Sequence, residues 1–379
     1  SLICGRSPGC PPSRSKVHST FKQRFKMPKI DHNRLRELGF EIYRALEAPE
    51  EIARVVADYQ VDTNLAGHDS HGCLAIPRFA RDVRSGKIIP TAIPEVVRED
   101  GPTALINGNR SFGMYSAHTA VKLASEKGKK FGIGAVGVTN CNHVGGLWGF
   151  VKSVVDEGMI GLMWCSAGPR GGSMAPFGGM RRVMAGNPIG FGVPGKSRPP
   201  LVTDISTATA AGGKVLIALQ KGEKIPDHWV LDEAGQPTSD PEAFMTEDLE
   251  IFGAMRPFGE HKGYALALFA EVIGGILTGY GPAYRDDYIE GNGTFVIAID
   301  VERFIDLDTF RTEVDGYFTA VKSVPTDPHT DEILIPGEME CRTRIERERD
   351  GIPFAENTWQ TIVDTAASVG LEVPAPLQE

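Results

Sequence analysis

The chain has 379 residues, 41% of them hydrophobic and 23% charged, which is enough for two or three structural units around a sizeable core. Its formal net charge of −9 argues against a nucleic-acid partner. The longest apolar run, residues 263–281, has Glu271 at its centre and contains several glycines, so it predicts a buried helix and no membrane partner.

The first 26 residues differ from the rest of the chain in charge. They hold six Lys and Arg residues and no Asp or Glu, which leaves a formal net charge of −15 on residues 27–379. A basic, Ser-containing, acid-free leader is typical of a transit peptide, and equally of a tag or of translated upstream sequence. We favour the second interpretation, with Met27 as the native start, and expect residues 1–26 to be a disordered, non-native extension.

The six cysteines form no metal-binding or disulfide pattern. No C-x-x-C pair occurs, and two cysteines lie in the basic extension; the other four are Cys73, Cys141, Cys165 and Cys341. Their spacings suit neither a zinc site nor a disulfide framework. We therefore expect reduced cysteines, a cytoplasmic protein and no bound metal.

The region after Met27 has the periodicity of helices. Asp31 can cap a helix whose apolar residues recur at spacings of three and four, and Pro49 followed by two glutamates can open a second helix. The polar segment 67–72 interrupts this pattern, and a third helix is expected over residues 75–88. The first native unit is therefore expected to be helical.

The middle of the chain alternates between helical and extended patterns. We expect helices over residues 116–130 and 149–159, and strands over residues 133–138, 160–165 and 200–206. This alternation predicts an α/β or α+β domain.

The last third of the chain begins with long polar stretches and ends in helical patterns. An apolar helix is expected after Lys262, and a late strand over residues 293–304. Helices are then expected over residues 308–321 and 357–370, separated by an irregular loop over residues 325–338.

A literal G-x-G-x-x-G occurs at Gly132, Gly134 and Gly137, the pattern of a Rossmann phosphate-binding turn. That turn needs a strand before the glycines and a helix opening at them. Here a helix comes first and a strand follows, so Gly128 and Gly132 fit the end of a helix, where positive φ is needed. We interpret the motif as a false positive and find no other strand–glycine–helix segment.

Two histidine-containing segments carry the candidate chemistry. His143 follows an expected strand, and the glycines at 145 and 146 allow close approach of a ligand or another backbone. A second cluster has four consecutive polar residues, His68, Asp69, Ser70 and His71. A glycine-rich stretch over residues 168–179 can bind phosphates through N–H groups, or be an ordinary surface loop. A lone His143 would be read as a structural histidine, but the clusters together favour an active site.

Seven segments together resemble the malate/L-lactate dehydrogenase family of the non-Rossmann type. They appear in family order with family-like spacing: GHDSHG (67–72), NCNHVGG (140–146), MAPFGG (174–179), GNPIGFGVP (186–194), DIST (204–207), HKGYALAL (261–268) and IPGE (335–338). The family includes ureidoglycolate, sulfolactate and 2,3-diketogulonate oxidoreductases, and reductases of piperideine- and pyrroline-2-carboxylate. The resemblance extends from about Met27 to the C-terminus.

The resemblance implies a homodimeric oxidoreductase that uses NAD or NADP on a small carboxylate substrate. It implies an α/β (α+β) fold with its own nucleotide-binding central domain over residues 101–305. A mainly helical domain would be formed from both chain ends, residues 27–100 and 306–379.

The resemblance also assigns roles to individual residues. It implies that His143 is the acid/base and that Ser70 and His71 line the active site. Some descriptions of the family instead give the proton-donor role to the histidine of the S-H-G motif, here His71. The implied cofactor contacts are Ser166, Asp204, Ile205, Ser206, His261, Lys262, Pro336, Gly337 and Glu338.

The proposed chemistry needs a base and a carboxylate clamp. Oxidation of a 2-hydroxy acid removes a hydroxyl proton while hydride leaves C2, and histidine, with an ordinary pKa of about 6.5, suits that step. Many relatives carry an arginine five residues after the motif serine, where this chain has Ala75. Arg78, one helical turn later, or Arg170 in the glycine-rich stretch can take its place. The choice of NAD or NADP stays open, because any of four cations could face a 2′-phosphate: Arg170, Arg181, Arg182 and Lys214.

The leading hypothesis is therefore a 2-hydroxy acid dehydrogenase, with a cyclic-imine carboxylate reductase as the alternative within the family. A metal hydrolase would use His68, Asp69, His71 and His143 as ligands, although no acidic partner is evident near His143. A non-catalytic binding protein built on a decayed enzyme is disfavoured, because both histidines and Lys262 are present.

Overall fold

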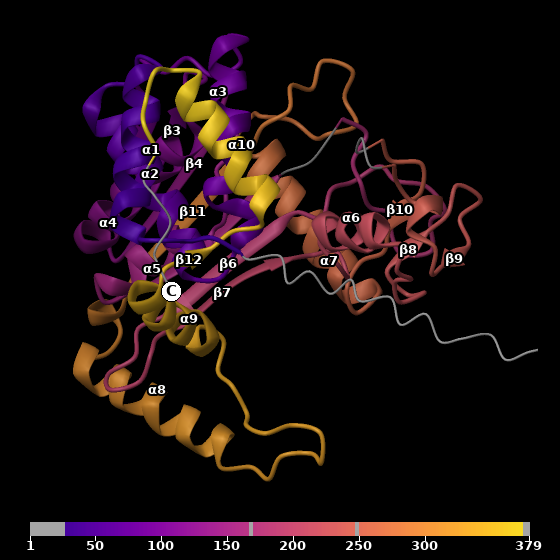
Figure 1. Ribbon diagram of the computed structural model, residues 1–379. Helices are drawn as coiled ribbons and strands as arrows, with labels where there is room; N and C mark the ends of the chain where they lie inside the picture. Colours follow the sequence, from indigo (N-terminus) through magenta and orange to yellow (C-terminus); the bar gives the residue numbers. More distant parts are fainter. Residues whose placement is uncertain (1–26, 167–169, 247–249, 374–379) are drawn as a thin grey trace, which may run out of the picture.

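The computed structural model describes residues 27–166, 170–246 and 250–373, so the basic extension expected at residues 1–26 lies outside the described residues. Its centre is a seven-stranded sheet with the order β2-β3-β4-β11-β5-β6-β7 (Figure 1). The strands are β2 (Glu95–Asp100), β3 (Thr103–Asn107), β4 (Ile133–Thr139), β11 (Gly293–Asp300), β5 (Met159–Ser166), β6 (Pro188–Val193) and β7 (Leu201–Ser206). β3 and β4 run parallel and the other neighbouring pairs are antiparallel, which is not the parallel sheet of a Rossmann domain.

Helices cover both faces of this sheet. α4 and α5 pack on one face with α2 outside them, while α7 and its π-helical continuation (Glu271–Ile276) pack on the other. The helices are α1 (His32–Ala45), α2 (Glu50–Leu65), α3 (Ile76–Arg84), α4 (Gly113–Phe131), α5 (Trp148–Asp156), α6 (Gly212–Lys221), α7 (His261–Ala270), α8 (Leu307–Lys322), α9 (Glu338–Asp350) and α10 (Glu356–Ala367). The predicted mixed α/β class is therefore confirmed.

The two ends of the chain meet. The Asp31 carboxylate accepts hydrogen bonds from the backbone N–H groups of Asn33 and Arg34 and so caps α1, as predicted. β1 (Lys29–Ile30) pairs with β12 (Ile352–Pro353), and α10 packs against α3 and α1. The division into two domains stays a prediction; β2, which lies before the expected boundary at 101, belongs to the central sheet.

A small lobe stands beside the main sheet, on the right of Figure 1. It contains α6 and a three-stranded sheet of β10 (Ala254–Met255), β8 (Val230–Leu231) and β9 (Pro237–Thr238). Its core is separate from the main one and rich in methionine, with Met174, Met184, Met245 and Met255 around Val215 and Phe244. The sequence patterns did not predict this lobe, because its strands are two residues long.

The glycine motif joins a helix to a strand, as predicted. α4 ends at Phe131, and Gly132 caps it with a φ of 90°. β4 begins at the next residue, and a Cβ added at Gly134 would lie 2.0 Å from the carbonyl oxygen of Ala124. Gly134 therefore lets the strand pass against α4. The expectation for Gly128 was wrong, since this residue lies inside α4.

The expectation that no other strand–glycine–helix segment exists was also wrong. β7 ends at Ser206, and after a short connection Gly212 and Gly213 open α6, with Lys214 in its first turn. Five residues lie between the end of the strand and these glycines, so the segment does not match the G-x-G-x-x-G spacing that we searched for.

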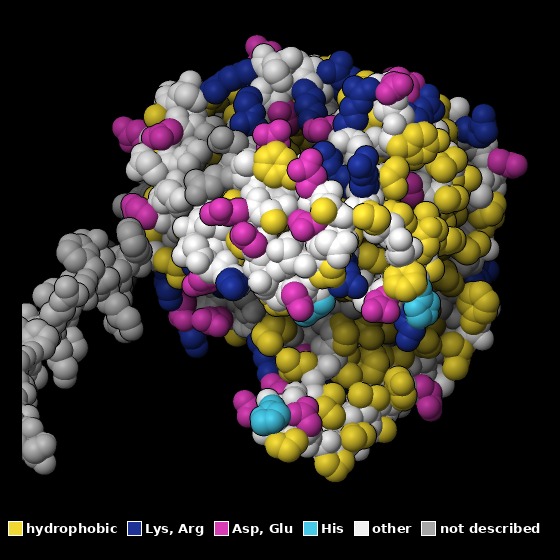
Figure 2. All heavy atoms as spheres, turned by 90° about the vertical axis from the view of Figure 1, so that its right-hand side faces the viewer, with side chains coloured by type: hydrophobic (Ala, Val, Ile, Leu, Met, Phe, Trp, Pro, Cys, Tyr) yellow, Lys and Arg dark blue, Asp and Glu magenta, His cyan; other side chains and the backbone are white. Residues whose placement is uncertain are grey.

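The apolar run at residues 263–281 forms α7 and the π-helical turn. Among the described residues, no helix is long and apolar enough to cross a membrane. The expectation of a buried helix holds for one side only, where Gly263, Ala267 and Ala270 face the sheet. The other side exposes six large apolar side chains by 40% to 61%: Leu266, Leu268, Phe269, Val272, Ile276 and Leu277. Figure 2 shows broad hydrophobic areas on the face of the molecule that lies to the right in Figure 1.

Candidate active site

A cavity of about 610 Å³ lies where two loops of the main body face the small lobe. The main body contributes the loop after β4 and the 3₁₀ turn Asp69–His71. The lobe contributes the segment from β7 into α6, together with Phe244, Met245, Ile251 and Met255. The cavity therefore combines polar groups from the body with an apolar wall from the lobe, as in most small-molecule sites.

The structure brings the predicted catalytic residues together at this cavity. Ser70, His71 and His143 all line it. The rings of His71 and His143 are stacked, with centroids 5.9 Å apart and planes 22° apart. The Ser70 hydroxyl Oγ lies 2.7 Å from Nδ1 of His71. Residues 73 positions apart in sequence thus form one polar cluster.

The loop that carries His143 also fixes which ring nitrogen is available. The backbone N–H of Gly145 donates a hydrogen bond of 2.9 Å to Nδ1 of His143. Because Nδ1 accepts this bond, the proton of the neutral ring resides on Nε2. Gly145 has a φ of 81°, which a glycine adopts without strain.

Both histidines are shifted toward the neutral form. Burial holds the pKa of His143 well below its usual value, and the positive charges of Arg78, His71 and Lys87 lower it further. Burial also lowers the pKa of His71, while the carboxylate of Asp204 opposes this change. The pKa of His143 therefore lies below the ordinary histidine value of about 6.5.

Asp204, expected to bind cofactor, holds the His143 loop in place. Its Oδ2 accepts hydrogen bonds from the backbone N–H groups of Leu147, at 2.6 Å, and Trp148, at 3.3 Å, at the start of α5. A carboxylate there is stabilised by the helix dipole. Ser206 also lines the cavity and donates to the carbonyl of Gly186 at 3.0 Å. Ile205 is 37% exposed and does not line the cavity.

The other expected cofactor residues lie elsewhere. Ser166 is 1% exposed at the end of β5, and its Oγ has no hydrogen-bond partner. His261 and Lys262 are exposed at the start of α7, with His261 5.9 Å from the ring of Phe177. Neither they nor Ser166 line the histidine cavity.

The IPGE segment forms the start of α9. The carbonyl oxygen of Pro336 accepts a hydrogen bond from Val202 N, and Gly337 precedes the helix with a φ of 102°. The buried Glu338 pairs with Lys322 and accepts from Ile335 N at 3.1 Å. In this chain, Pro336, Gly337 and Glu338 therefore have structural partners and do not line the cavity.

The two candidate arginines for a carboxylate clamp differ in position. Arg78 projects from α3, largely buried, and burial lowers its pKa; its Nε has no hydrogen-bond partner. Its charge acts on both cavity histidines. Arg170 is exposed on the surface and pairs with Asp286. Neither arginine lines the cavity, but of the two only Arg78 is close enough for its charge to act on the cavity histidines.

Sequence reasoning missed one contributor to the cavity, Asn292, and did not single out another, Lys214. Asn292, just before β11, accepts from Val144 N at 2.9 Å and donates to Ser166 O at 3.0 Å, so it joins two loops. No pattern around a single asparagine announces that role. Lys214 was one of four cations considered for a 2′-phosphate, and among those four it alone lines the cavity.

The metal-hydrolase alternative loses its ligands in this structure. Both Asp69 oxygens accept hydrogen bonds from Arg347, at 2.6 and 3.0 Å. His68 lies 3.7 Å from Glu340. Within the described ranges, no group of three or more His, Cys, Asp or Glu side chains is placed to hold a metal ion.

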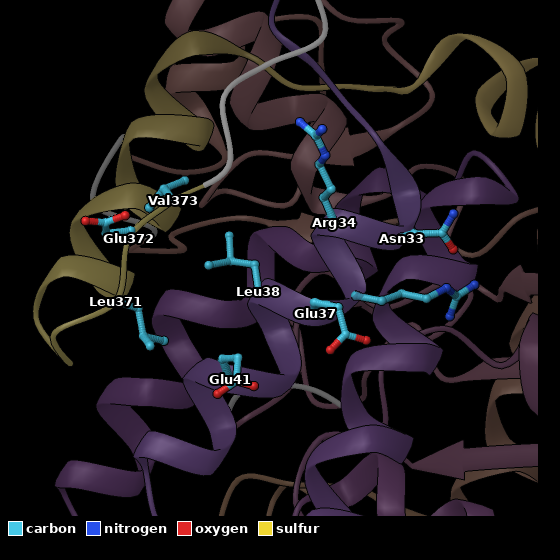
Figure 3. Close-up of a pocket in the computed structure, with 9 residues that line it drawn as sticks. Asn33, Arg34, Glu37, Leu38, Glu41, Leu371, Glu372 and Val373 are labelled. Atoms are coloured by element: carbon cyan, nitrogen blue, oxygen red, sulfur yellow. The ribbon is translucent and has the colours of Figure 1, made fainter.

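A separate cavity of about 580 Å³ lies between α1 and residues 371–373 (Figure 3). It shares no lining residue with the histidine cavity. Two of its charged groups are in ion pairs: Arg36 pairs with Asp58 and Asp62, and Glu37 pairs with Arg54. We assign it no role.

Comparisons with known proteins agree with the motifs. A model of the malate/L-lactate dehydrogenase family matches residues 30–363. The chain is 35% identical over 339 residues to L-sulfolactate dehydrogenase of Methanothermobacter thermautotrophicus, covering 88% of this chain and 95% of that protein. It is 32% identical over 351 residues to hydroxycarboxylate dehydrogenase B of Escherichia coli, covering 90% and 95% respectively.

Solved structures show the same fold. Sulfolactate dehydrogenase from Methanocaldococcus jannaschii superposes with a TM-score of 0.82 at 31% identity, covering 91% of this chain and 98% of that one. Δ1-Piperideine-2-carboxylate reductase from Pseudomonas syringae gives a TM-score of 0.77 at 23% identity, covering 89% and 99%, which is a likeness of fold.

These matches define the class of the protein: it is an enzyme, a dehydrogenase of hydroxy acids, and its family implies a nicotinamide cofactor. The chain belongs to the malate/L-lactate dehydrogenase family. The resemblance drawn from the sequence motifs is therefore confirmed.

The assignment of the carboxylate clamp predicts a difference between two conservative variants. Arg78→Lys should raise the KM for the carboxylate substrate by roughly 10- to 100-fold, because lysine lacks the planar fork that pairs with a carboxylate. Arg170→Lys, a surface substitution, should leave KM unchanged. Steady-state kinetics at saturating cofactor measure both, and the reverse result would move the clamp to Arg170.

Proposed function

We propose that the protein interconverts a 2-hydroxy acid and its 2-oxo acid by hydride transfer to or from NAD or NADP in the histidine cavity. The observation that carries this proposal is that one cavity holds Ser70, His71 and His143 opposite the glycine-led start of α6. The three side chains can donate a proton to a substrate oxygen or accept one from it. The start of α6 can bind phosphates.

The lining of the cavity supports a nicotinamide dinucleotide as its ligand. Gly146 and Gly186 line it, and an added Cβ would lie 3.3 Å from Asp204 Oδ2 in one case and 3.0 Å from Ser206 Oγ in the other, so the missing side chains let these two polar groups approach the backbone at the cavity. The first-turn N–H groups of α6 and the ammonium of Lys214 suit the phosphates. Bound there, the dinucleotide supplies or takes up the hydride.

The substrate would lie against His143 in the cavity, with its carboxylate directed toward Arg78. With Nδ1 bonded to Gly145, the neutral His143 presents Nε2–H to the 2-oxo oxygen. As hydride reaches C2, that proton moves to the oxygen, and the amide of Gly145 stabilises the negative charge left on the ring. A neutral imidazole suits this electrophilic role, and the low pKa of His143 keeps it neutral.

The names of the relatives bear on the choice of substrate. The two relatives compared above are named for sulfolactate and for hydroxycarboxylates, which supports a 2-hydroxy acid as the substrate. The likeness to the piperideine-2-carboxylate reductase is one of fold, and no feature of this cavity favours an imine. A panel of 2-oxo acids and cyclic imines assayed with both reduced cofactors separates the two.

We place the enzyme in the cytoplasm. Four described cysteines, Cys73, Cys141, Cys165 and Cys341, are free thiols. Cys141 follows Asn140 in the loop that carries His143. Burial raises the pKa of its thiol to about 12, so this thiol is unreactive.

The proton-transfer assignment predicts that His143→Ala lowers kcat by about 10²- to 10⁴-fold, because general acid/base catalysis contributes that much. The Kd for NADH and NADPH should change little. His71→Ala should impair the chemical step less, and His329→Ala, an exposed control, should have no effect. Turnover and direct dinucleotide titration measure these effects. Near-normal turnover of His143→Ala, with none for His71→Ala, would make His71 the proton donor.

The cofactor site predicts that Lys214→Ala weakens dinucleotide binding by roughly 10-fold or more, through loss of a charge-assisted contact. Fluorescence titration should show a larger loss for NADPH than for NADH if Lys214 faces a 2′-phosphate, and equal losses if it faces the pyrophosphate. Lys262→Ala is the companion variant. A loss confined to Lys262→Ala would move the phosphates to the start of α7.

We propose that the exposed apolar side of α7 binds a second copy of the chain. Phe269, Val272 and Ile276 follow helical spacing and form one stripe, and surfaces of this kind mark protein interfaces. Light scattering should give twice the mass of the chain for the wild type. Phe269→Glu should shift it to the monomer and Val97→Glu, on exposed β2, should not; a monomeric wild type would contradict the proposal.

A further inference from the structure

The turn that carries Ser70 and His71 is poorly stabilised by its own backbone. It is a 3₁₀ turn of three residues without a side-chain cap. Its two backbone hydrogen bonds are His71 N to His68 O, at 3.0 Å, and Gly72 N to Asp69 O, at 3.5 Å. Short 3₁₀ segments have weak hydrogen-bond geometry, so the orientation of this turn depends on neighbouring side chains.

Asn64 supplies the first of these contacts from the end of α2. It is 1% exposed. Its Nδ2 donates to Asp69 Oδ1 at 2.7 Å, and its Oδ1 accepts from Cys73 N at 2.7 Å. One buried amide therefore joins the residues on either side of Ser70 and His71.

Arg347 completes the arrangement from α9, 278 residues away in sequence. Its guanidinium donates to both oxygens of Asp69, at 2.6 and 3.0 Å, and to the carbonyl of Asn64 at 2.5 Å. The Arg347 side chain is 15% exposed. Two parallel bonds from a planar fork fix the direction of the carboxylate as well as its position.

The residues of α9 that approach the turn and the segment before it all lie on one face of the helix. Glu340 lies near His68, a Cβ added at Gly67 would lie 3.3 Å from Thr343 Cγ2, and Arg347 binds Asp69. Positions 340, 343 and 347 lie three and four residues apart, so they project from one side of a helix. One face of α9 therefore lies along residues 67–69, next to the Ser70–His71 turn.

We propose that Arg347 is a positioning residue: through Asp69 it fixes the Ser70–His71 turn against the cavity. The proposal rests on the proposed function, in which Ser70 and His71 line the reacting centre. Arg347 itself does not line the cavity and acts through its partner. Small misplacements of catalytic groups cost rate far more than they cost binding.

The test compares Arg347→Gln and Arg347→Lys with Arg342→Gln. Arg342 is on the same helix, 52% exposed, and pairs with Glu332 away from the turn. Arg347→Gln should lower kcat by roughly 10- to 100-fold with dinucleotide Kd unchanged. Arg347→Lys should recover part of this loss, because it keeps the charge without the fork. Arg342→Gln should match the wild type in both.

Hydrogen exchange of the peptide spanning residues 66–75 tests the clamp without any turnover. Arg347→Gln should speed exchange at Cys73 and its neighbours, and Arg342→Gln should not. Unchanged exchange in Arg347→Gln would overturn the proposal, and so would a wild-type kcat in an active enzyme. If the wild-type protein turns over no 2-oxo acid, the proposed function fails, while exchange still decides whether Arg347 holds the turn.

A double variant with Asp69→Asn shows whether Arg347 acts through Asp69. If it does, kcat of the double variant should equal that of Arg347→Gln, because the second change removes a contact already lost. Losses that multiply would show that Arg347 acts by another route and would overturn the proposal.

Discussion

The carboxylate of Asp204 is the interaction on which the site depends. It accepts hydrogen bonds from the N–H groups of Leu147 and Trp148 at the start of α5, and so ties β7 to the loop that carries His143. It also lines the cavity, and its charge is the one that favours the protonated form of His71. An uncapped helix end beside a half-buried, unpaired carboxylate would cost free energy twice, once for the orphan donors and once for the charge.

Much of the fold follows from local patterns in the sequence. The caps at Asp31 and Gly132, the apolar spacing of the first two helices and the β-branched run of β4 each predict the observed element. Elements without a strong local pattern were missed. α9 is charged on nearly every side and is held by ion pairs, while two of the six residues of β6 are glycines, because Gly190 and Gly192 pack directly on α5. Tertiary contacts decide such segments, and one sequence does not display those contacts.

The site was predictable as a set of residues and less so as an arrangement. His71 and His143 meet as the motifs implied, because the loops that carry them end at the same cavity. The pKa of His143 was not predictable, since it depends on burial and on Arg78 from another helix. Likewise, the role of Lys214 depends on where α6 begins, and that of Glu338 on Lys322, which comes from α8.

The central claim is that His143 works from its neutral form, and the pH dependence of hydride transfer tests it most directly. A histidine whose pKa is lowered stays neutral as pH rises through about 6.5, and becomes charged only as pH falls through its lowered value. The single-turnover rate of 2-oxo acid reduction, followed with deuterated and ordinary reduced cofactor, should therefore be flat between about pH 6 and pH 9. A rate that falls as pH rises, with an apparent pKa near 6.5 that disappears in His143→Ala, would show a protonated donor and contradict the account.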